Sequence, residues 1–294
     1  HDHRIPLHYP LRPTLRGVQQ IGPLRAKVTD PFGICEFERE LIKPSRLMVV
    51  PRTERLSGML AGSGVGAGDE GAARRGTGPG DPDAIVRQYR QGDDLRKVHW
   101  PSTARRDELM VRLEQQPGHG GTTVLIDHRA AAHHGTGPAA SIEWAVSFAA
   151  SVCLHLRRAG HRVRLVTEHG HMLADIPPDS GAAYDDVALD ALAVLQPAHQ
   201  RDITLGGDPA VGQELVAVLG SVSNQAIHEL SQYRPRGVRS LAVLLDTAAW
   251  STGVTASAER SGAARESARL LEAAGWGVVV ADPASSLQQV WTRL

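Results

Sequence analysis

The pattern of apolar and polar positions changes near residue 122 of the 294-residue chain. Downstream, continuous apolar runs alternate with segments whose apolar residues recur every three to four positions. The runs predict strands covered on both faces, at 123–126, 163–166, 215–219, 241–245 and 278–280. The other segments predict helices, at 141–159, 184–195, 224–233, 263–274 and 285–293. We expect Ser141 to cap the first helix and Gly160 to end it.

The repeated strand–helix units predict an α/β domain over residues 122–294, built on a doubly wound, mostly parallel sheet. Residues 1–56 form a smaller β-rich segment, in which 26–28 and 47–50 look like strands and 30–33 like a turn. This segment is too small to form a sandwich by itself. Residues 57–83 are rich in glycine and predict a flexible loop. Residues 84–121 join the two parts, with strands expected at 85–89 and 109–113.

Composition excludes several classes of function. Basic and acidic residues are equal in number, 32 each, so nothing indicates a nucleic-acid binder. The two cysteines, Cys35 and Cys153, form neither a disulfide framework nor a zinc motif. No apolar run is long enough to cross a membrane. The chain begins with His rather than Met, and we read it as a soluble fragment of a longer protein.

The predicted strand ends carry the first set of candidate ligands. Ligands of open parallel sheets bind beyond the carboxyl ends of the strands, where Asp127, Ser221 and Asp246 are expected. Acidic residues there can hold a metal, or they can cap the following loop. Arg129 beside Asp127 would repel a cation, and two strand spacings of roughly 10 Å would separate Asp127 from Asp246. We therefore predict no metal and no cofactor.

The 14 histidines do not form a recognisable metal motif. His128, His133 and His134 cluster after the first predicted strand, but no H-E-x-x-H pattern or cysteine pair accompanies them. We interpret them as solvated loop residues. The sequence also lacks a P-loop and a nucleophile elbow.

The segment from Arg87 to Arg105 is the most unusual part of the chain, because charges of both signs surround three aromatic rings. One interpretation is a hydrolase site, in which Asp93 or Asp94 orients His99 and Ser102 is the nucleophile. The other is a structural joint, in which arginines pair with the aspartates and the aromatic residues are buried. We favour the joint, because Pro101 makes the triad geometry hard to hold.

The same segment resembles a bacterial family called domain of unknown function, number 58. The residues that carry the resemblance are Arg87, Tyr89, Gly92, Asp93, Arg96, His99, Trp100, Thr103, Ala104 and Arg105. Residues 30–33 and the strand–helix pattern also resemble that family, whose second half is similar to a von Willebrand factor A-like domain. A metal-competent domain of that type has Asp-x-Ser-x-Ser after its first strand. Here Asp127, Arg129 and Ala131 stand in those places, so both hydroxyls are missing.

The resemblance implies a protein anchored by membrane helices that lie outside this sequence, with its soluble part on the cytoplasmic face of the bacterial membrane. It also implies a MoxR-type AAA+ ATPase as a partner. We expect a non-enzymatic interaction module, with two alternatives: the hydrolase described above, and a small-molecule or metal binder at the strand ends.

Overall fold

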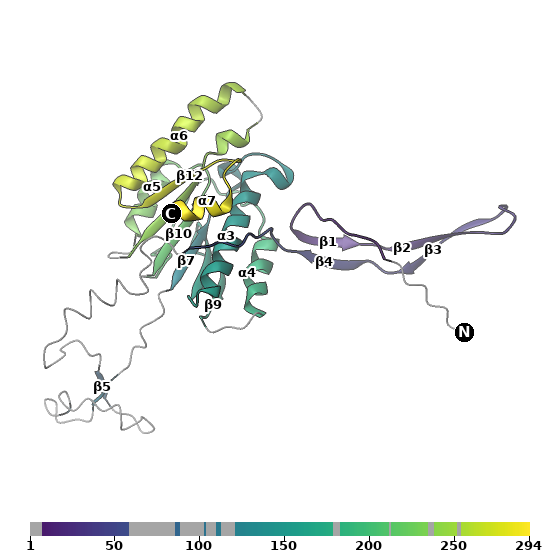
Figure 1. The fold of residues 1–294 in the computed structure, drawn as a ribbon, viewed down its shortest axis with the longest axis horizontal. Helices are drawn as coiled ribbons and strands as arrows, with labels where there is room; N and C mark the ends of the chain where they lie inside the picture. The colour runs from purple at the N-terminus through teal and green to yellow at the C-terminus, as the bar shows by residue number, and fades with distance from the viewer. Residues whose placement is uncertain are drawn as a thin grey trace. The chain divides into compact units, whose positions relative to one another are not determined.

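The computed structural model describes residues 8–58, 86–88, 103, 110–112, 121–178, 183–211, 213–234, 238–251 and 254–294. The chain divides into two compact units. The first contains residues 1–58 and 121–294, and the second contains residues 59–120. The first unit holds a six-stranded sheet with helices on both faces and a smaller β-rich part (Figure 1). The expected α/β class, with a mostly parallel sheet and a β-rich N-terminal part, is therefore confirmed.

The sheet has the strand order β12-β11-β10-β7-β8-β9. Its strands are β7 (Thr122–Ile126), β8 (Val163–Thr167), β9 (Met172–Ile176), β10 (Glu214–Leu219), β11 (Ser240–Leu245) and β12 (Gly277–Ala281). All neighbouring pairs are parallel except β8 and β9. Counted along the chain this is the order 3-2-1-4-5-6, which reverses between β7 and β10. The edge strand β9 was not predicted, because its sequence alternates and two prolines follow it.

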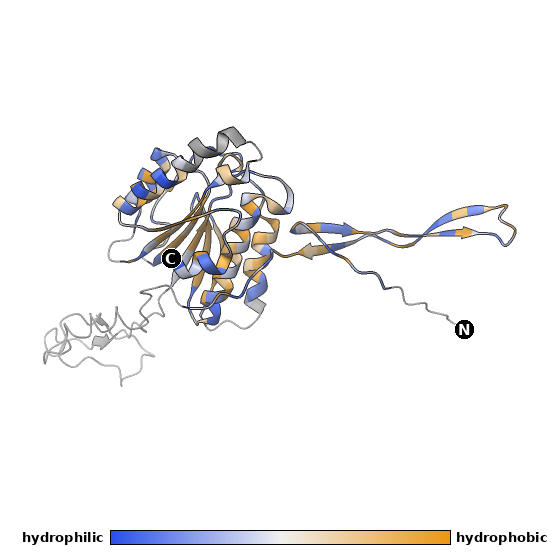
Figure 2. Cartoon of the chain, turned by 45° about the horizontal axis from the view of Figure 1, so that its top comes forward, coloured by the Kyte–Doolittle hydropathy of each residue, from blue (hydrophilic) through white to orange (hydrophobic). Residues whose placement is uncertain are grey.

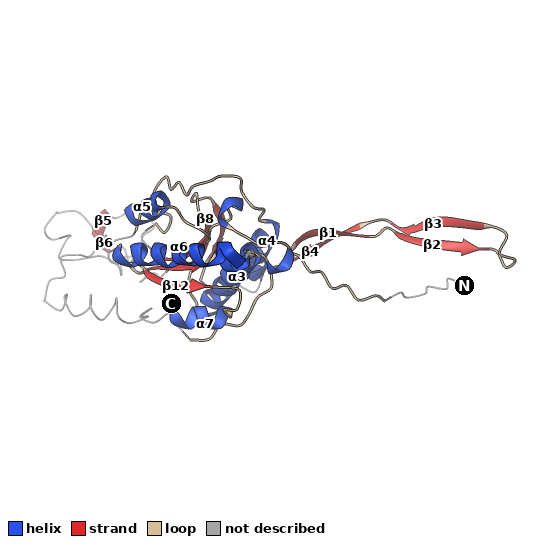
Figure 3. Ribbon diagram, turned by 90° about the horizontal axis from the view of Figure 1, so that it is seen from above, coloured by secondary structure: helices blue, strands red, loops and turns tan. Residues whose placement is uncertain are grey.

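Helices cover both faces of the sheet (Figure 3). The α-helices of this domain are α3 (Ser141–Arg158), α4 (Ala183–Val194), α5 (Asn224–Gln232), α6 (Val254–Ala273) and α7 (Leu287–Arg293). Short 3-10 helices are η2 (Ala130–Ala132), η3 (Gly137–Ala139) and η4 (Thr247–Trp250). Helices α3, α4 and α7 lie on one face, where His155 of α3 meets Trp291 of α7 edge to face. Helices α5 and α6 pack together on the other face.

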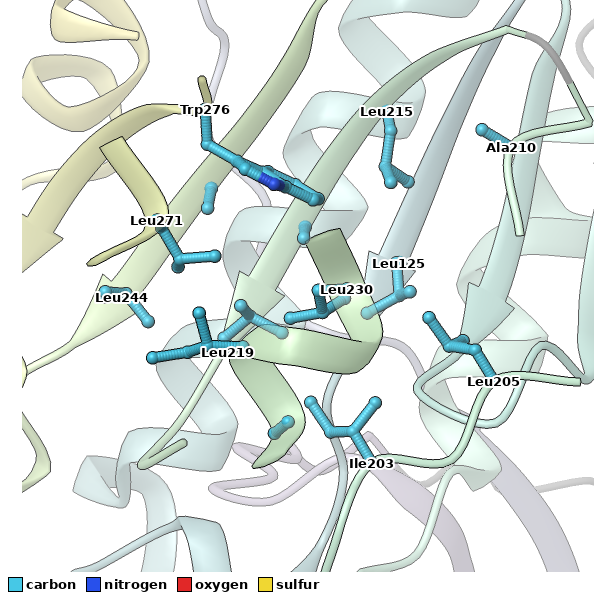
Figure 4. Packing of buried hydrophobic residues seen from close by; sticks show 14 of the residues in the cluster. Leu125, Ile203, Leu205, Ala210, Leu215, Leu219, Leu230, Leu244, Leu271 and Trp276 are labelled. Atoms are coloured by element: carbon cyan, nitrogen blue, oxygen red, sulfur yellow. The ribbon is translucent and has the colours of Figure 1, made fainter. Parts of the chain in front are cut away.

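The core forms because alternate residues of each strand point to opposite helix layers. Under α5 and α6, strand residues Leu125, Leu219 and Leu244 pack with Leu230 and Leu271 (Figure 4). Burying one such leucine contributes about 1.5–3 kcal/mol. Figure 2 shows the strands in apolar colours between the helices. This fixes the strand ends in space, and with them the loops that follow.

The long helix α3 begins as its sequence suggests but is not capped by Ser141. The N-cap residue is Ala140, and no side chain caps this end. The Ser141 hydroxyl instead accepts a hydrogen bond from the backbone N–H of His134, in the loop before the helix. This correction has a physical reason: the loop folds back over the helix start and offers its own donor. At the other end, Gly160 has a φ of +82° and ends the helix as expected.

The β-rich part is one long two-stranded ribbon. Strand β1 (Gly17–Ile21) pairs with β4 (Ser45–Val49), and β2 (Leu24–Thr29) pairs with β3 (Glu36–Ile42), both antiparallel. Residues 22–23 separate β1 from β2. Because Gly17 pairs with Val49 and Leu24 pairs with Ile42, the register is the same on both sides of this gap. The register shifts by one residue at a bulge after Leu24. The tip closes through Asp30, whose carboxylate accepts hydrogen bonds from the N–H groups of Ile34 and Cys35. We call residues 17–49 the β ribbon.

Both strands of the β ribbon are fixed at their base. The Arg16 side chain donates to the carbonyl oxygens of Leu192 and Leu195 at the end of α4 and pairs with Glu143 of α3. After β4, residues 51–58 run alongside helices α3 and α7 and are hydrogen-bonded to both. There the N–H of Glu54 donates to the Ser151 hydroxyl, and the Trp291 indole donates to the carbonyl of Gly58. The segment before residue 58 is therefore packed on the α/β domain.

Of the second unit, the structure describes Thr103 and two short strands. Strands β5 (Val86–Gln88) and β6 (Met110–Arg112) pair antiparallel, which confirms the two strands expected on either side of the charged segment. The glycine-rich loop expected at 57–83 lies almost entirely outside the described residues. Among the helices that the structure describes, none combines the length and the apolar character needed to cross a membrane.

Candidate functional site

The candidate site is the carboxyl edge of the sheet, where β7, β8, β10 and β11 end. Asp127 follows β7, Glu168 follows β8, Ser221 stands two residues after β10, and Asp246 follows β11. Because strand order reverses between β7 and β10, the crevice usually used by ligands lies between Asp127 and Ser221. Asp246 is one strand further out, as the sequence suggests.

The crevice is occupied by the Arg129 guanidinium, which forms a bidentate ion pair with Asp127. Nε of Arg129 donates to Oδ1 of Asp127 over 2.9 Å, and Nη2 donates to Oδ2 over 2.7 Å. The backbone N–H groups of Arg129 and Gly220 donate to the same two oxygens. The Asp127 side chain is fully buried and that of Arg129 is 3% exposed. Every oxygen of this carboxylate is thus already bonded within the chain.

The remaining guanidinium donors bind backbone oxygens across the edge. Nη1 donates to the carbonyl of Arg201 over 2.7 Å, and Nη2 donates to that of Ser221 over 3.0 Å. Burial alone would lower the pKa of Arg129, but its hydrogen bond to Asp127 and the charges of Asp127, Glu168 and Asp202 raise it above the ordinary value. The guanidinium therefore stays charged, and it joins β7, β10 and the segment before β10.

The loop after β7 closes the crevice through backbone hydrogen bonds to the segments on either side of it. The N–H of Ser221 donates to the carbonyl of Ala132, and Ala130 donates to that of Ala198. Gly220 permits this close approach, because a Cβ at that position would lie 2.2 Å from the Ala132 oxygen. Asp127 and Ser221 are thus brought together, but through backbone and guanidinium bonds and not as two open ligands.

His133 is part of this closure. Its Nε2 lies 2.8 Å from the carbonyl oxygen of Asp127, and its Nδ1 lies 3.1 Å from the Ser141 hydroxyl. A carbonyl only accepts, so we assign the proton to Nε2, and Nδ1 accepts from the hydroxyl. Burial lowers the pKa of His133 and keeps the ring neutral. The expectation that this histidine is a solvated loop residue is therefore wrong.

A second buried carboxylate, Glu168, lies at the end of β8. Its Oε2 accepts from the backbone N–H of His128 over 3.1 Å and lies 2.6 Å from Nδ1 of that ring. Within the part of the chain that the structure describes, its Oε1 has no hydrogen-bond partner, and it lies 3.5 Å from Nε2 of His169. Nδ1 of His169 in turn lies 3.1 Å from the Thr204 hydroxyl.

Burial raises the pKa of Glu168, but the hydrogen bond and charge of His128 outweigh burial and lower it. The carboxylate is therefore ionised and orients the His128 ring. Sequence reasoning missed Glu168 and His169. The available signal was the position of Glu168, directly after an apolar strand as Asp127 is after β7. Thr204 gave no such signal, because it lies in a loop 35 residues after its partner His169.

Asp246 has a different environment. Its backbone N–H donates to the carbonyl of Ala281, and its Oδ1 is buried without a hydrogen-bond partner among the described residues. It precedes η4 but its side chain does not cap that helix. Throughout the described ranges, no three histidine, cysteine, aspartate or glutamate side chains are placed to hold a metal ion.

Most of the charged segment from Arg87 to Arg105 lies outside the described residues. This applies to Tyr89, Gly92, Asp93, Arg96, His99, Trp100, Ser102 and Arg105. The backbone of Arg87 belongs to β5, and Thr103 has a partner contact. The hydrolase hypothesis and the structural-joint hypothesis both remain predictions.

The fold and this edge define a mixed α/β protein whose strand-end crevice is filled by an internal ion pair. Residues 85–220 match the family described as "Protein of unknown function DUF58". The match includes the charged segment and ends at Gly220, the glycine that contacts the loop after β7.

Three curated relatives, all described as uncharacterized proteins, come from Mycobacterium bovis and Mycobacterium tuberculosis. Each is 25% identical over 188 residues, which is 64% of this chain and 53% of the relative. The matched stretch thus spans about half the length of these relatives.

Proposed function

We propose that this chain is a non-enzymatic protein-interaction module that needs no metal. The observation that carries the proposal is the Asp127–Arg129 pair, because it fills the crevice where a sheet of this order normally binds its ligand. A divalent ion there would have to displace a cation that is covalently tethered two residues away. Removing one partner of a buried ion pair costs about 3–5 kcal/mol, so displacement is strongly opposed.

The α/β domain is, in this proposal, of the von Willebrand factor A-like type. Its strand order and the aspartate directly after the first strand support this type. Arg129 and Ala131 stand where a metal-binding member has hydroxyl residues. The guanidinium then supplies the positive charge that the metal supplies in those members. In this proposal, the ion pair holds the strand ends together in place of the metal, and the domain binds its partner without a metal.

The parent protein is, in the same proposal, tethered to the bacterial membrane with this part on the cytoplasmic side, and its partner is a MoxR-type AAA+ ATPase. The resemblance of the segment from Arg87 to Arg105 supports both statements. An interaction role also agrees with the β ribbon, which is fixed at its base and leaves strand β3 exposed along its whole length.

The test is a binding measurement between the full-length protein in detergent and the purified MoxR-type ATPase of the same genome, with either Mg²⁺ or EDTA. We expect saturable binding whose dissociation constant is the same in both buffers. A binding signal that disappears in EDTA would contradict the metal-independent site. Absence of binding in both buffers would contradict the partner, and turnover of an ester or peptide substrate would contradict the non-enzymatic role.

A further inference from the structure

Residues 195–202 connect the end of α4 to the segment that precedes β10, and we call them the strap. The structure describes all of these residues, and from 196 to 202 none of them is buried. The position of the strap therefore depends on hydrogen bonds of its backbone and not on core packing. A segment held in this way can open while the sheet stays folded, because its release uncovers no core side chain.

The base of the β ribbon holds the first end of the strap. Arg16, directly before β1, donates from Nε to the carbonyl oxygen of Leu192 over 2.9 Å and from Nη2 to that of Leu195 over 2.7 Å. The last carbonyl groups of a helix lack partners within the helix, and a cation is favourable beside them. The Arg16 side chain is only 7% exposed, so water competes little for these bonds.

The carboxyl edge of the sheet holds the other end of the strap. The N–H of Ala198 donates to the carbonyl of His128 over 2.8 Å, and the carbonyl of Ala198 accepts from the N–H of Ala130 over 2.7 Å. Further on, the carbonyl of Arg201 accepts from Nη1 of Arg129 over 2.7 Å. The strap is therefore one of the segments that close the strand-end crevice, and it is bonded to the guanidinium that fills the crevice.

We propose that the strap couples the β ribbon to the carboxyl edge, so that displacement of the ribbon at Arg16 opens the crevice beside Asp127. The two anchors are close along the chain, since only Gln196 and Pro197 separate Leu195 from Ala198. Proline restricts the backbone, so a movement of the Leu195 carbonyl has little slack to absorb it before it reaches the Ala198 bonds.

The proposal has two states. In the strapped state all of these bonds are formed, and in the released state Ala198 and Arg201 have left the edge. An element with two arrangements, biased from both of its ends, is what coupling between separate regions requires. The inference goes beyond the proposed function, because it concerns a movement within the chain and requires no particular partner.

The test is hydrogen exchange of backbone amides in the present chain, followed by NMR. Arg16→Ala removes both bonds to the end of α4. We expect the amides of Ala198 and Ala130 to exchange about tenfold faster relative to the amides of β11, because hydrogen bonds that open together lose protection together. The β11 amides serve as the reference, since they lie in the core of the sheet and report on global unfolding.

Two control variants separate release of the strap from a general loosening of α4. Glu143→Gln removes the charge that pairs with Arg16 but leaves the Arg16 bonds to the α4 carbonyls. Arg157→Ala removes the hydrogen bond to Asp185 in the first turn of α4, at the opposite end of that helix. Neither variant should change the relative exchange rate of Ala198.

Arg16→Lys is a second test variant with less risk to folding. It keeps a positive charge beside Glu143 but lacks the planar fork that binds two carbonyls, so it should also accelerate exchange at Ala198. Unchanged relative exchange at Ala198 in both Arg16 variants would overturn the proposal. An equal rise in Arg157→Ala would overturn it too, because the effect would then not depend on the ribbon.

The reverse direction gives an independent check, because coupling between two regions is reciprocal. Arg129→Ala removes the bond to Arg201 and should accelerate exchange of the Arg16 Nε–H, again relative to the β11 amides. An unchanged rate there would show that the edge does not act on the ribbon, which contradicts the proposal. These measurements use the chain alone. Their failure would leave the proposed function intact, and failure of ATPase binding would leave the strap intact.

Discussion

The carboxyl edge of the sheet and the β ribbon handle their charged and apolar groups in opposite ways. At the edge, Asp127, Arg129 and Glu168 are almost completely buried, and the chain supplies nearly all of their partners. On the ribbon, Phe37 and Ile42 are exposed and Arg39 has no acidic partner among the described residues. The comparison teaches that a buried cluster of charges can have its bonding groups used within the chain, whereas the apolar side chains of a two-stranded ribbon can remain exposed to solvent.

The comparison can be tested first with the same substitution in the core of the α/β domain and on the ribbon. Phe148 of α3 is fully buried and stacks on Trp144 with ring centroids 5.3 Å apart. Phe148→Ala should lower the free energy of unfolding by about 3–5 kcal/mol, because it leaves a cavity in the core. Phe37→Ala should change it by less than about 0.5 kcal/mol. Urea unfolding monitored by circular dichroism measures both. A large loss at Phe37 would mean that another surface covers the ribbon in solution.

The second test compares two arginine–aspartate pairs. Arg129→Ala should cost about 3 kcal/mol, because it leaves the Asp127 carboxylate buried and uncompensated. Arg162→Ala removes the bidentate pair with Asp175 on the surface and should cost less than about 1 kcal/mol. Thermal unfolding of the two variants gives the difference.

Two additions make the arginine test specific to charge. Free guanidinium at low millimolar concentration should recover part of the stability of Arg129→Ala and should not affect Arg162→Ala. The double variant Asp127→Ala/Arg129→Ala should be more stable than Arg129→Ala, because neither charge is then left unpaired. If Arg129→Ala is as mild as Arg162→Ala, the ion pair does not hold the edge together.

The third test uses two glutamates whose pKa values move in opposite directions. Burial favours a higher pKa for Glu168, but the hydrogen bond and charge of His128 lower it below 4.5. Its contribution to stability is then present above pH 4.5 and is lost as pH falls through the lower folded value. Glu168→Gln should therefore destabilise the protein by about 1–2 kcal/mol at pH 7, and the difference should vanish in acid.

Glu214 of β10 is the matched control with the opposite sign. Burial raises its pKa above 4.5, although Arg239, Thr122 and His161 partly offset this. Its favourable contribution is present below pH 4.5 and is lost as pH rises through the folded value. Glu214→Gln should therefore raise the melting temperature at pH 7. Melting curves from pH 3 to pH 8 decide both cases, and equal signs at pH 7 would refute the interpretation.

The sequence predicts the central strands because their apolar runs are continuous, as in Val124 to Ile126 and Leu241 to Leu245. It does not predict β3, whose glutamates and arginine alternate with apolar residues that stay exposed. The Asp127–Arg129 pair is accessible to sequence reasoning because the two residues are two positions apart. Their bonds to Arg201 and Ser221 are not, since these depend on the order in which the strands assemble.

The fourth test has the smallest expected effect and bears directly on the filled crevice. A site that binds Mg²⁺ with a dissociation constant of about 1 mM would add about 1.4 kcal/mol of stability at about 10 mM metal. That would raise the melting temperature by a few degrees. We expect no such rise for the wild-type chain, because the Arg129 guanidinium already neutralises Asp127. The Arg129→Ser/Ala131→Ser variant restores two hydroxyls beside Asp127, and its melting temperature should respond to Mg²⁺. A rise in the melting temperature of the wild-type chain with Mg²⁺ would show that a metal displaces the Arg129 guanidinium from Asp127. The carboxyl edge would then not be closed to ligands, and the contrast with the exposed ribbon would no longer hold.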